Sequence, residues 1–435
     1  FRNGRRILDV HLVLHKMDLK MSILFRNFVQ QRIWKRFVSI HDVQRPIVLG
    51  IETSCDDTSV AIVSSDRKIL TSRRFVNREI QQKFRGINPT VTADTHRNYI
   101  DDVIGGCLDD LSCRISDLDA VAVSTRPGLV ISLKVGVERA ISLCRLGRIP
   151  LIPVHHMRAH ALCGRLVDEN VNFPFLTLLI SGGHSILAVA HGPTDFDIVG
   201  SGESTSPGEC IDKIAREIGI KDEKMHFGAE VERLASLGTV EDCLRYTVKP
   251  PKSHGADFNF GSIKTSFLNL VRNDLSLPLD ERDLIAFCAS LQFQVAGHLC
   301  KKLHVGLDFE FLKMLFENLP KSLVVSGGVA ANKFILKMIK KIAENDGFRV
   351  MVPPKDLCTD NGEMIAWTGI EMLKKNSEII PFGEIPSFYY VHDKADIGSS
   401  DLRSKMIAQK YRPKRRLKVS SLLSDKLIFL GKPIS

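Results

Sequence analysis

The sequence predicts an α/β protein with more than one domain. A chain of 435 residues with 44% apolar residues is long enough for two or three cores and has the composition of an ordinary globular protein. Short apolar runs of strand length alternate with longer segments whose apolar residues recur at helical spacing. No run approaches the roughly 18 apolar residues of a membrane-spanning helix, so we expect no membrane span.

Six short runs are expected to be strands: 47–52, 59–63, 120–124, 176–181, 185–190 and 322–326. Five segments are expected to be helices: 131–145, 156–166, 283–304, 331–344 and 361–374. Two of the strands are followed by glycine pairs. Gly182-Gly183 leads into another strand and predicts a hairpin, whereas Gly327-Gly328 leads into a helix. Either pair could hold a nucleotide between two lobes or make only a tight turn.

The positive charge lies at the two ends of the chain. Residues 1–45 contain ten Lys/Arg and three Asp, and residues 403–418 contain eight Lys/Arg and no acid, within a net charge of +10. From Met21 to His41 the chain is amphipathic and free of acids, which predicts a mitochondrial presequence or upstream extension over 1–45, or else a basic surface helix. Ten cysteines without a CxxC pair indicate a reduced intracellular compartment.

Two histidines and an aspartate could bind a metal. His156 and His160 lie four residues apart on an expected helix, so both imidazoles project from one face, although such a pair is often structural. The pattern is not HExxH, which counts against a zinc protease. Asp360 precedes another expected helix, where it could cap that helix or supply a third ligand. Together the three would form a mixed O/N site suited to zinc or iron.

Further polar residues lie in loops beside the expected strands. The turn after the first strand carries Thr53, Ser54, Asp56, Asp57 and Thr58, which could contact phosphate through a cation or simply form a turn. Asn332 follows the second glycine pair and is available to a base or ribose. Asp212 and Lys213 open a further helix, which by itself is ordinary.

These segments, taken in order, resemble one family. The motifs LGIETSCDDTSVAIV, RPGLVISLKVG, PVHHMRAHAL, LLISGGHS, GECIDK, VVSGGVAANK and CTDNGEMIAW are similar to those of the tRNA threonylcarbamoyladenosine synthases of TsaD type, formerly described as O-sialoglycoprotein endopeptidases. The resemblance covers about residues 46–375 and is strongest to the stand-alone mitochondrial branch.

The resemblance implies two ribonuclease-H-like lobes of the actin-like ATPase and sugar-kinase superfamily, with the ligand in the cleft between them. We expect a first lobe over 46–157, to which 355–395 returns, a second lobe over 158–354, and a basic tail over 396–435. The implied reaction moves a threonylcarbamoyl group from threonylcarbamoyl-AMP to the N6 amine of adenosine 37 in tRNAs that read codons beginning with A. A metalloprotease, an ATP-dependent kinase or ATPase, and a non-enzymatic scaffold are the alternatives.

The resemblance also implies the site residues, one divalent metal ion per subunit, and the partners. The metal ligands would be His156, His160 and Asp360, and Asp56 would be the acidic residue nearest the transferred group. The adenylate contacts would be Leu179, Ile180, Ser181, Gly182, Gly183, Asp212, Gly228, Gly327, Gly328 and Asn332. The implied partners are tRNA, an upstream adenylate-forming synthase and a second copy of the chain, in the mitochondrial matrix.

Two departures from the family pattern concern the site. Arg126-Pro127-Gly128 replaces the usual GPG and adds a cation, and the segment around Gly228 differs enough to weaken that assignment. The basic tail around Tyr411 is either a contact surface for a phosphate backbone or a solvated or disordered tail with no partner.

Overall fold

The computed structural model describes residues 45–76, 88–202, 204–220, 227–249 and 251–430. The chain falls into two compact units, 1–46 and 47–435. The expected presequence therefore lies almost entirely outside the described residues. All helices and strands named below belong to the second unit.

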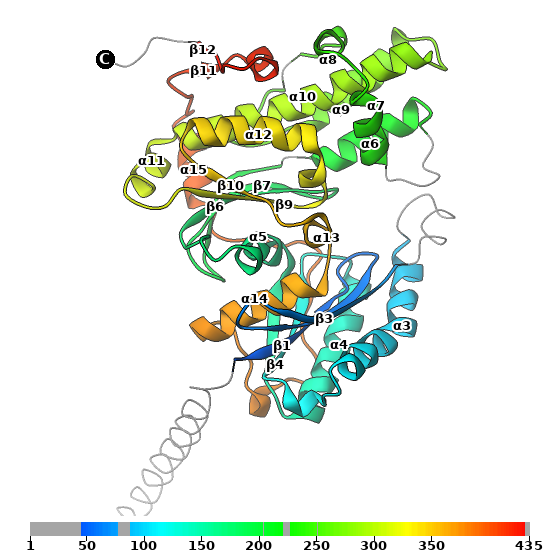
Figure 1. The fold of residues 1–435 in the computed structure, drawn as a ribbon, viewed down its shortest axis with the longest axis vertical. Coiled ribbons are helices and arrows are strands. Elements are labelled where there is room, and N and C mark those ends of the chain that lie inside the picture. The colour runs from blue at the N-terminus through cyan, green and yellow to red at the C-terminus, as the bar shows by residue number, and fades with distance from the viewer. Residues whose placement is uncertain (1–44, 77–87, 203, 221–226, 250, 431–435) are drawn as a thin grey trace, which may run out of the picture. The chain divides into compact units, whose positions relative to one another are not determined.

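Two five-stranded sheets form the framework (Figure 1). The first contains β1 (Ile47–Glu52), β2 (Thr58–Ser64), β3 (Ile69–Phe75), β4 (Ala120–Arg126) and β5 (Leu151–His155), in the order β3-β2-β1-β4-β5. The second contains β6 (Phe175–Ile180), β7 (Ser185–Ala190), β8 (Phe196–Ser201), β9 (Ser322–Ser326) and β10 (Arg349–Met351), in the order β10-β9-β6-β7-β8.

The two sheets share one topology. In each, three consecutive strands form an antiparallel meander. A later strand pairs in parallel with the first strand of that meander, and a fifth strand pairs in parallel with this later one. A repeated arrangement of this kind is the ribonuclease-H-like duplication, so the predicted fold class is confirmed. The six expected strands and the hairpin between β6 and β7 are confirmed as well.

The helices are α3 (Pro89–Asp110), α4 (Val130–Gly147), α5 (His156–Val167), α6 (Pro207–Glu217), α7 (Phe227–Ala235), α8 (Val240–Arg245), α9 (Phe260–Asn273), α10 (Glu281–Asp308), α11 (Glu310–Leu315), α12 (Lys333–Asn345), α13 (Lys355–Cys358), α14 (Gly362–Lys375) and α15 (Asp401–Ala408). Single 3-10 turns are η1 (Ile115–Asp117), η2 (Gly328–Ala331), η3 (Phe382–Glu384) and η4 (Val419–Leu423), and two short strands, β11 (Arg416–Leu417) and β12 (Phe429–Leu430), pair near the end. The five expected helices are confirmed. Within the described residues, none of these helices combines the length and apolar character that crossing a membrane requires.

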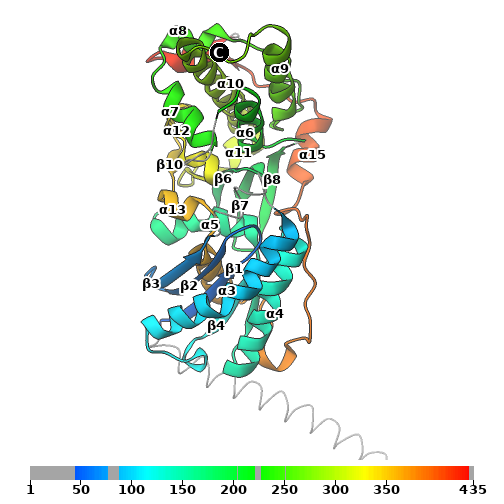
Figure 2. The same cartoon turned by 90° about the vertical axis from the view of Figure 1, so that its right-hand side faces the viewer.

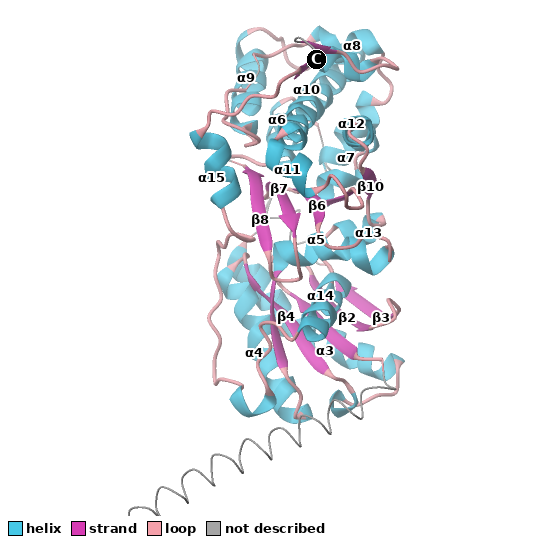
Figure 3. Ribbon diagram, turned by 90° about the vertical axis from the view of Figure 1, so that its left-hand side faces the viewer, coloured by secondary structure: helices cyan, strands magenta, loops and turns pink. Residues whose placement is uncertain are grey.

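Three apolar cores follow from the alternation of side chains along the strands. Leu49 of β1 packs with α3 and α4 on one face of the first sheet, whereas Val48 belongs to the core on the other face. That middle core also contains residues of α5, α14 and the second sheet, so these two helices lie between the sheets (Figure 3). The third core joins the far face of the second sheet to α6, α7, α9, α10 and α12.

Glycines let α14 lie directly against the first sheet. A Cβ on Gly50 would come 2.3 Å from Gly362 O, and a Cβ on Gly362 would come 2.6 Å from Ala61 N. Neither clash could be relieved by moving a side chain, because the atoms met are backbone. The start of α14, just after Asp360, is thereby fixed against β1 and β2.

The segment after α14 links both sheets along one side (Figure 2). Ile380 pairs with Leu151 of β5, and Ser399 pairs with Asp197 of β8. The segment therefore returns to the first sheet before it reaches the second. The lobe bounds expected from the sequence stay a prediction.

The basic C-terminal segment is folded onto α10, so the alternative of a disordered tail is wrong. The Tyr411 hydroxyl donates to Asp308 O at 2.6 Å, and Arg403 donates to both carboxylate oxygens of Asp257 at 2.7 and 3.0 Å. Leu422 of η4 is fully buried in the third core. Aromatic and apolar residues among the cations anchor the segment, which the count of charges alone did not reveal.

Candidate active site

His156 and His160 meet at the junction of β5 and α5. The strand ends at His155 and the helix begins at the next residue, which puts His156 and His160 on successive turns of one helix face. Both side chains are buried, and their Nε2 atoms lie 3.2 Å apart with the rings nearly perpendicular. Two ring nitrogens so close together need a proton or a cation between them.

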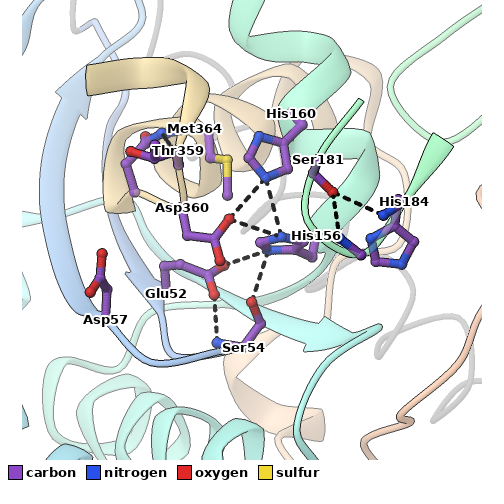
Figure 4. A network of polar contacts seen from close by, with 12 residues as sticks. Glu52, Ser54, Asp57, His156, His160, Ser181, His184, Thr359, Asp360 and Met364 are labelled. Carbon is purple, nitrogen blue, oxygen red and sulfur yellow. Dashed lines mark hydrogen bonds and ion pairs between the residues drawn. The ribbon is translucent and has the colours of Figure 1, made fainter. Parts of the chain in front are cut away.

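Asp360 completes this cluster from the loop between α13 and α14 (Figure 4). Its Oδ1 lies 3.1 Å from His160 Nε2 and 3.4 Å from His156 Nε2. The alternative that Asp360 caps α14 is wrong, because Asn361 is the cap and accepts a hydrogen bond from Met364 N–H at 2.7 Å. With capping done by its neighbour, the Asp360 carboxylate is turned toward the two histidines.

Glu52 is a member of the site that the sequence analysis missed. It ends β1, is fully buried, and places Oε2 3.0 Å from His156 Nδ1. A carboxylate only accepts hydrogen bonds, so Nδ1 carries a proton, and Nε2, which faces His160 and Asp360, is the nitrogen that a metal ion would bind. Its other oxygen, Oε1, accepts from Ser54 N–H. The available signal was an acid at the end of an otherwise apolar strand.

The two carboxylates control the charge of His156. Burial alone would lower the pKa of His156, but the nearby negative charges of Glu52 and Asp360 outweigh it and hold that pKa well above its usual range. The pKa of Asp360 is held well below its usual range, because the charge of His156 and hydrogen bonds from both histidines outweigh its burial. The two carboxylates thus stabilise positive charge at the histidines, as a proton in the free cluster or as a bound cation in its place.

The donor set fits one divalent metal ion. His156 Nε2, His160 Nε2 and Asp360 Oδ1 all lie within 4.8 Å of one another. Glu52 supplies the outer hydrogen bond that metal-binding histidines commonly make. His160 Nδ1 is buried and has no hydrogen-bond partner among the described residues, so the ring orientation of His156 is better fixed than that of His160. Three protein ligands leave coordination positions for a substrate.

The polar turn between β1 and β2 is held beside this cluster. His96 of α3 contacts Cys55 O through Nε2 at 3.0 Å and Thr58 Oγ1 through Nδ1 at 2.7 Å, and Asp56 and Asp57 of the turn are half-buried. Burial, helped by the charges of Asp56, Asp360 and Glu52, raises the pKa of Asp57 to about 7 against the opposing charge of Arg74. The role of Asp56 near a transferred group stays a prediction.

The first glycine pair forms the turn between β6 and β7. Ser181 Oγ accepts hydrogen bonds from Gly183 N–H at 3.2 Å and His184 N–H at 3.0 Å (Figure 4). A Cβ on Gly182 or Gly183 would meet nothing within 4 Å, and neither has positive φ. The protein's own fold therefore does not require glycine at these two positions.

This turn lies next to the start of α6 and near the metal cluster. Ser206 caps α6 and donates its hydroxyl to Gly182 O. The pKa of His184 is lowered to about 4, mainly by burial and further by the charges of His156 and His160. Asp212 is half-buried on α6, one to two turns from the helix start, and Leu179 and Ile180 end β6.

The second glycine pair differs from the first. Gly327 has φ of 99°, and a Cβ there would lie 2.4 Å from Ile180 O, so the fold itself requires glycine. A Cβ on Gly328 would meet nothing within 4 Å. Asn332 caps α12 by accepting from Ile335 N–H and donates to Gln292 Oε1 at 2.8 Å, which leaves one amide N–H of its side chain. Gly228 begins α7, where a Cβ would also meet nothing.

The extra cation of the Arg126-Pro127-Gly128 loop shares one acid with a second arginine. Arg126 forms an ion pair of 3.4 Å with Glu378, whose other oxygen accepts from Arg158 at 3.2 Å. Gly128 still allows close approach, since a Cβ there would lie 2.7 Å from Ser54 O. The substitution therefore keeps the backbone contact with the turn after β1.

The duplicated ribonuclease-H-like fold and the His/Asp cluster between its sheets define a two-lobed α/β protein with a candidate metal centre. HypF from T. kodakarensis shares the fold, with a TM-score of 0.51 and 14% identity over 76% of this chain and 48% of that one. The family model described as TsaD, tRNA N6-adenosine threonylcarbamoyltransferase, matches residues 68–367. The chain belongs to this family and is a tRNA-modifying transferase.

Curated relatives agree over most of their length. A Caenorhabditis elegans protein named probable mitochondrial tRNA N6-adenosine threonylcarbamoyltransferase is 45% identical over 92% of this chain and 93% of its own. Mitochondrial enzymes of the same name from Danio rerio and Homo sapiens are each 35% identical, over 90% and 77% of this chain and 98% and 82% of theirs. These names indicate a mitochondrial location.

Proposed function

We propose that the chain transfers the threonylcarbamoyl group of threonylcarbamoyl-AMP to the N6 amine of adenosine 37, in mitochondrial tRNAs that read codons beginning with A. The observation that carries the proposal is the convergence of His156, His160 and Asp360 beside the Ser181–His184 turn. A charged cluster next to an open backbone turn suits an acyl-adenylate, which carries a phosphate and a polar acyl group.

The reaction forms a bond between N6 and the carbamoyl carbon and breaks the bond from that carbon to the phosphate oxygen, so AMP leaves. The amine is a weak nucleophile, and holding it against a good leaving group supplies most of what is needed. Asp56 is our candidate acceptor for the proton that N6 loses. Backbone at Gly182, Gly183 and Gly328 would approach the adenylate, because no side chain intervenes.

His156, His160 and Asp360 would hold one divalent ion of zinc or iron type. When bound, the ion would stabilise negative charge on a carbamoyl or phosphate oxygen. Glu52 would keep the His156 lone pair directed at the ion. We further propose that the enzyme acts in the matrix as a homodimer and takes its adenylate from a separate adenylate-forming synthase.

The test is a reconstituted reaction. The purified full chain is incubated with mitochondrial tRNA, threonine, bicarbonate, ATP and an adenylate-forming synthase, and digested tRNA is analysed by mass spectrometry. Threonylcarbamoyladenosine that appears only with the chain present supports the proposal. Peptide cleavage, or ATP hydrolysis that needs no synthase, without any modified nucleoside would favour the protease or ATPase alternatives.

A further inference from the structure

Helix α12 carries a line of lysines on the face opposite its buried side. Ile335, Met338, Ile339 and Ile342 are buried, whereas Lys333 and Lys337 are exposed and Lys340 and Lys341 are half-buried. At 100° per residue these four lysines fall on one face, and from Lys333 to Lys341 they extend about 12 Å along the helix. Glu344, near its C-terminal end, is the only acidic residue of the helix.

The stability of the helix does not account for these charges. Lys333 is the first residue of α12 and no acid lies in the first turn, although the positive end of the helix dipole disfavours a cation there. Within the described residues, the side chains of Lys333 and Lys337 form no ion pair. Glu232 of α7 does accept a hydrogen bond from Lys333 N–H at 2.7 Å, but it contacts the backbone and leaves the ammonium groups of Lys333 and Lys337 free to meet a ligand outside the chain.

The line of lysines joins the glycine site to the C-terminal segment. At its start, Asn332 caps α12 directly after η2, which contains Gly328. Toward its end, Lys341 Nζ donates to Leu422 O at 2.9 Å and to Ser424 O at 2.6 Å. At Lys341 the lysine line therefore contacts the folded C-terminal segment.

Two cations of that segment extend the charged surface. Leu417 of β11 is buried, and its neighbours Arg416 and Lys418 are exposed because side chains alternate along a strand. Neither side chain has an ion-pair partner in the described part of the chain. We define the basic track as Lys333, Lys337, Lys340, Lys341, Arg416 and Lys418.

We propose that the basic track binds the phosphate backbone of the substrate tRNA. This inference rests on the proposed function, since the nucleotide to be modified must reach the acyl group of the adenylate, which the proposed function seats against Gly328, while the rest of the RNA lies outside. A tRNA whose anticodon loop reaches the adenylate carries regularly spaced phosphates away from it, which matches a row of cations that begins near Gly328 and continues outward. Phosphate contacts of this kind position the RNA without reading its sequence.

Deleting the C-terminal segment would not test this, because Arg403, Tyr411 and Leu422 hold it in the fold. Neutral substitutions are cleaner. The double variant Lys337→Gln/Lys418→Gln removes one cation from each part of the track. Lys134→Gln/Lys375→Gln removes two exposed lysines from α4 and α14 and is the matched control. The fourfold variant Lys333→Gln/Lys337→Gln/Arg416→Gln/Lys418→Gln tests additivity.

Binding of the full chain to mitochondrial tRNA is measured over a range of salt concentrations. Each lost phosphate contact should flatten the slope of log affinity against log salt by about 0.7 to 0.9, hence by up to about 3 for the fourfold variant. The control should keep the wild-type slope and affinity. Equal changes of affinity and salt slope in the track and control variants, or no change in the fourfold variant, would refute tRNA binding by the basic track. A wild-type chain that forms no modified nucleoside would instead overturn the proposed function.

Discussion

Replacing Glu52 with glutamine should weaken metal binding without unfolding the protein. Glu52 uses one oxygen to accept from Ser54 N–H and the other to accept from His156 Nδ1–H. Glutamine has a single acceptor oxygen, so its NH2 group must face one of these two donors. If it faces His156, the imidazole has to take its proton on Nε2, which blocks the lone pair that would bind the metal.

The expected loss is about 10- to 100-fold in metal affinity, the usual effect of removing an outer partner of a metal ligand, which corresponds to about 1.4 to 2.8 kcal/mol. Affinity is measured by competition with a chelator of known strength. Glu371→Gln is the matched control, because Glu371 is also buried but contacts Arg165 at 3.3 Å. A folded Glu52→Gln protein that binds metal as tightly as the control would refute the tautomer argument.

Three other outcomes are expected. His160→Ala and Asp360→Ala should each lower bound metal and activity, measured by elemental analysis and tRNA modification, while near-ultraviolet circular dichroism stays native; full occupancy in either would move the site elsewhere. Gly183→Val should have the same free energy of unfolding as the wild type but bind threonylcarbamoyl-AMP weakly. Gly327→Ala should lose at least about 1–3 kcal/mol of stability from its positive φ and its contact with Ile180 O. A destabilised Gly183→Val protein beside a fully stable Gly327→Ala protein would contradict the geometry. The pKa of His298 is lowered to about 3 by burial and by Lys302 and Lys301, and its Nε2 accepts from Asn259 N–H, so the unfolded chain binds the extra proton and stability is lost as pH falls below about 6.5. Wild type should therefore lose about 2 kcal/mol more than His298→Gln between pH 7 and pH 5 in denaturant unfolding, and parallel losses would argue against a neutral buried histidine.

The sequence was most informative where the chemistry is local. His156 and His160 share a helix face by spacing alone, and the strands of both sheets follow from short apolar runs. Glu52 could not be assigned because its partner is 104 residues away and only the tertiary fold brings β1 to α5. The orientation of Asp360 likewise depended on which neighbour caps α14, a choice between Asp360 and Asn361 that composition does not make. The C-terminal segment shows the opposite error, because its charges concealed the half-buried Tyr411 and the buried Leu422, which anchor it.

The most direct test of the central claim follows the acyl group itself. Threonylcarbamoyl-AMP labelled at the carbamoyl carbon is mixed with excess purified chain and mitochondrial tRNA in a single turnover, with no ATP, threonine or synthase present. We expect the label to move to the N6 position of adenosine 37 as AMP is released. A tRNA with guanosine at position 37 should stay unlabelled, and His156→Ala should abolish transfer. Label that never reaches adenosine 37 would rule out the proposed transfer. Label that reaches it equally fast with the His156→Ala protein would rule out a role for the His156 site in it.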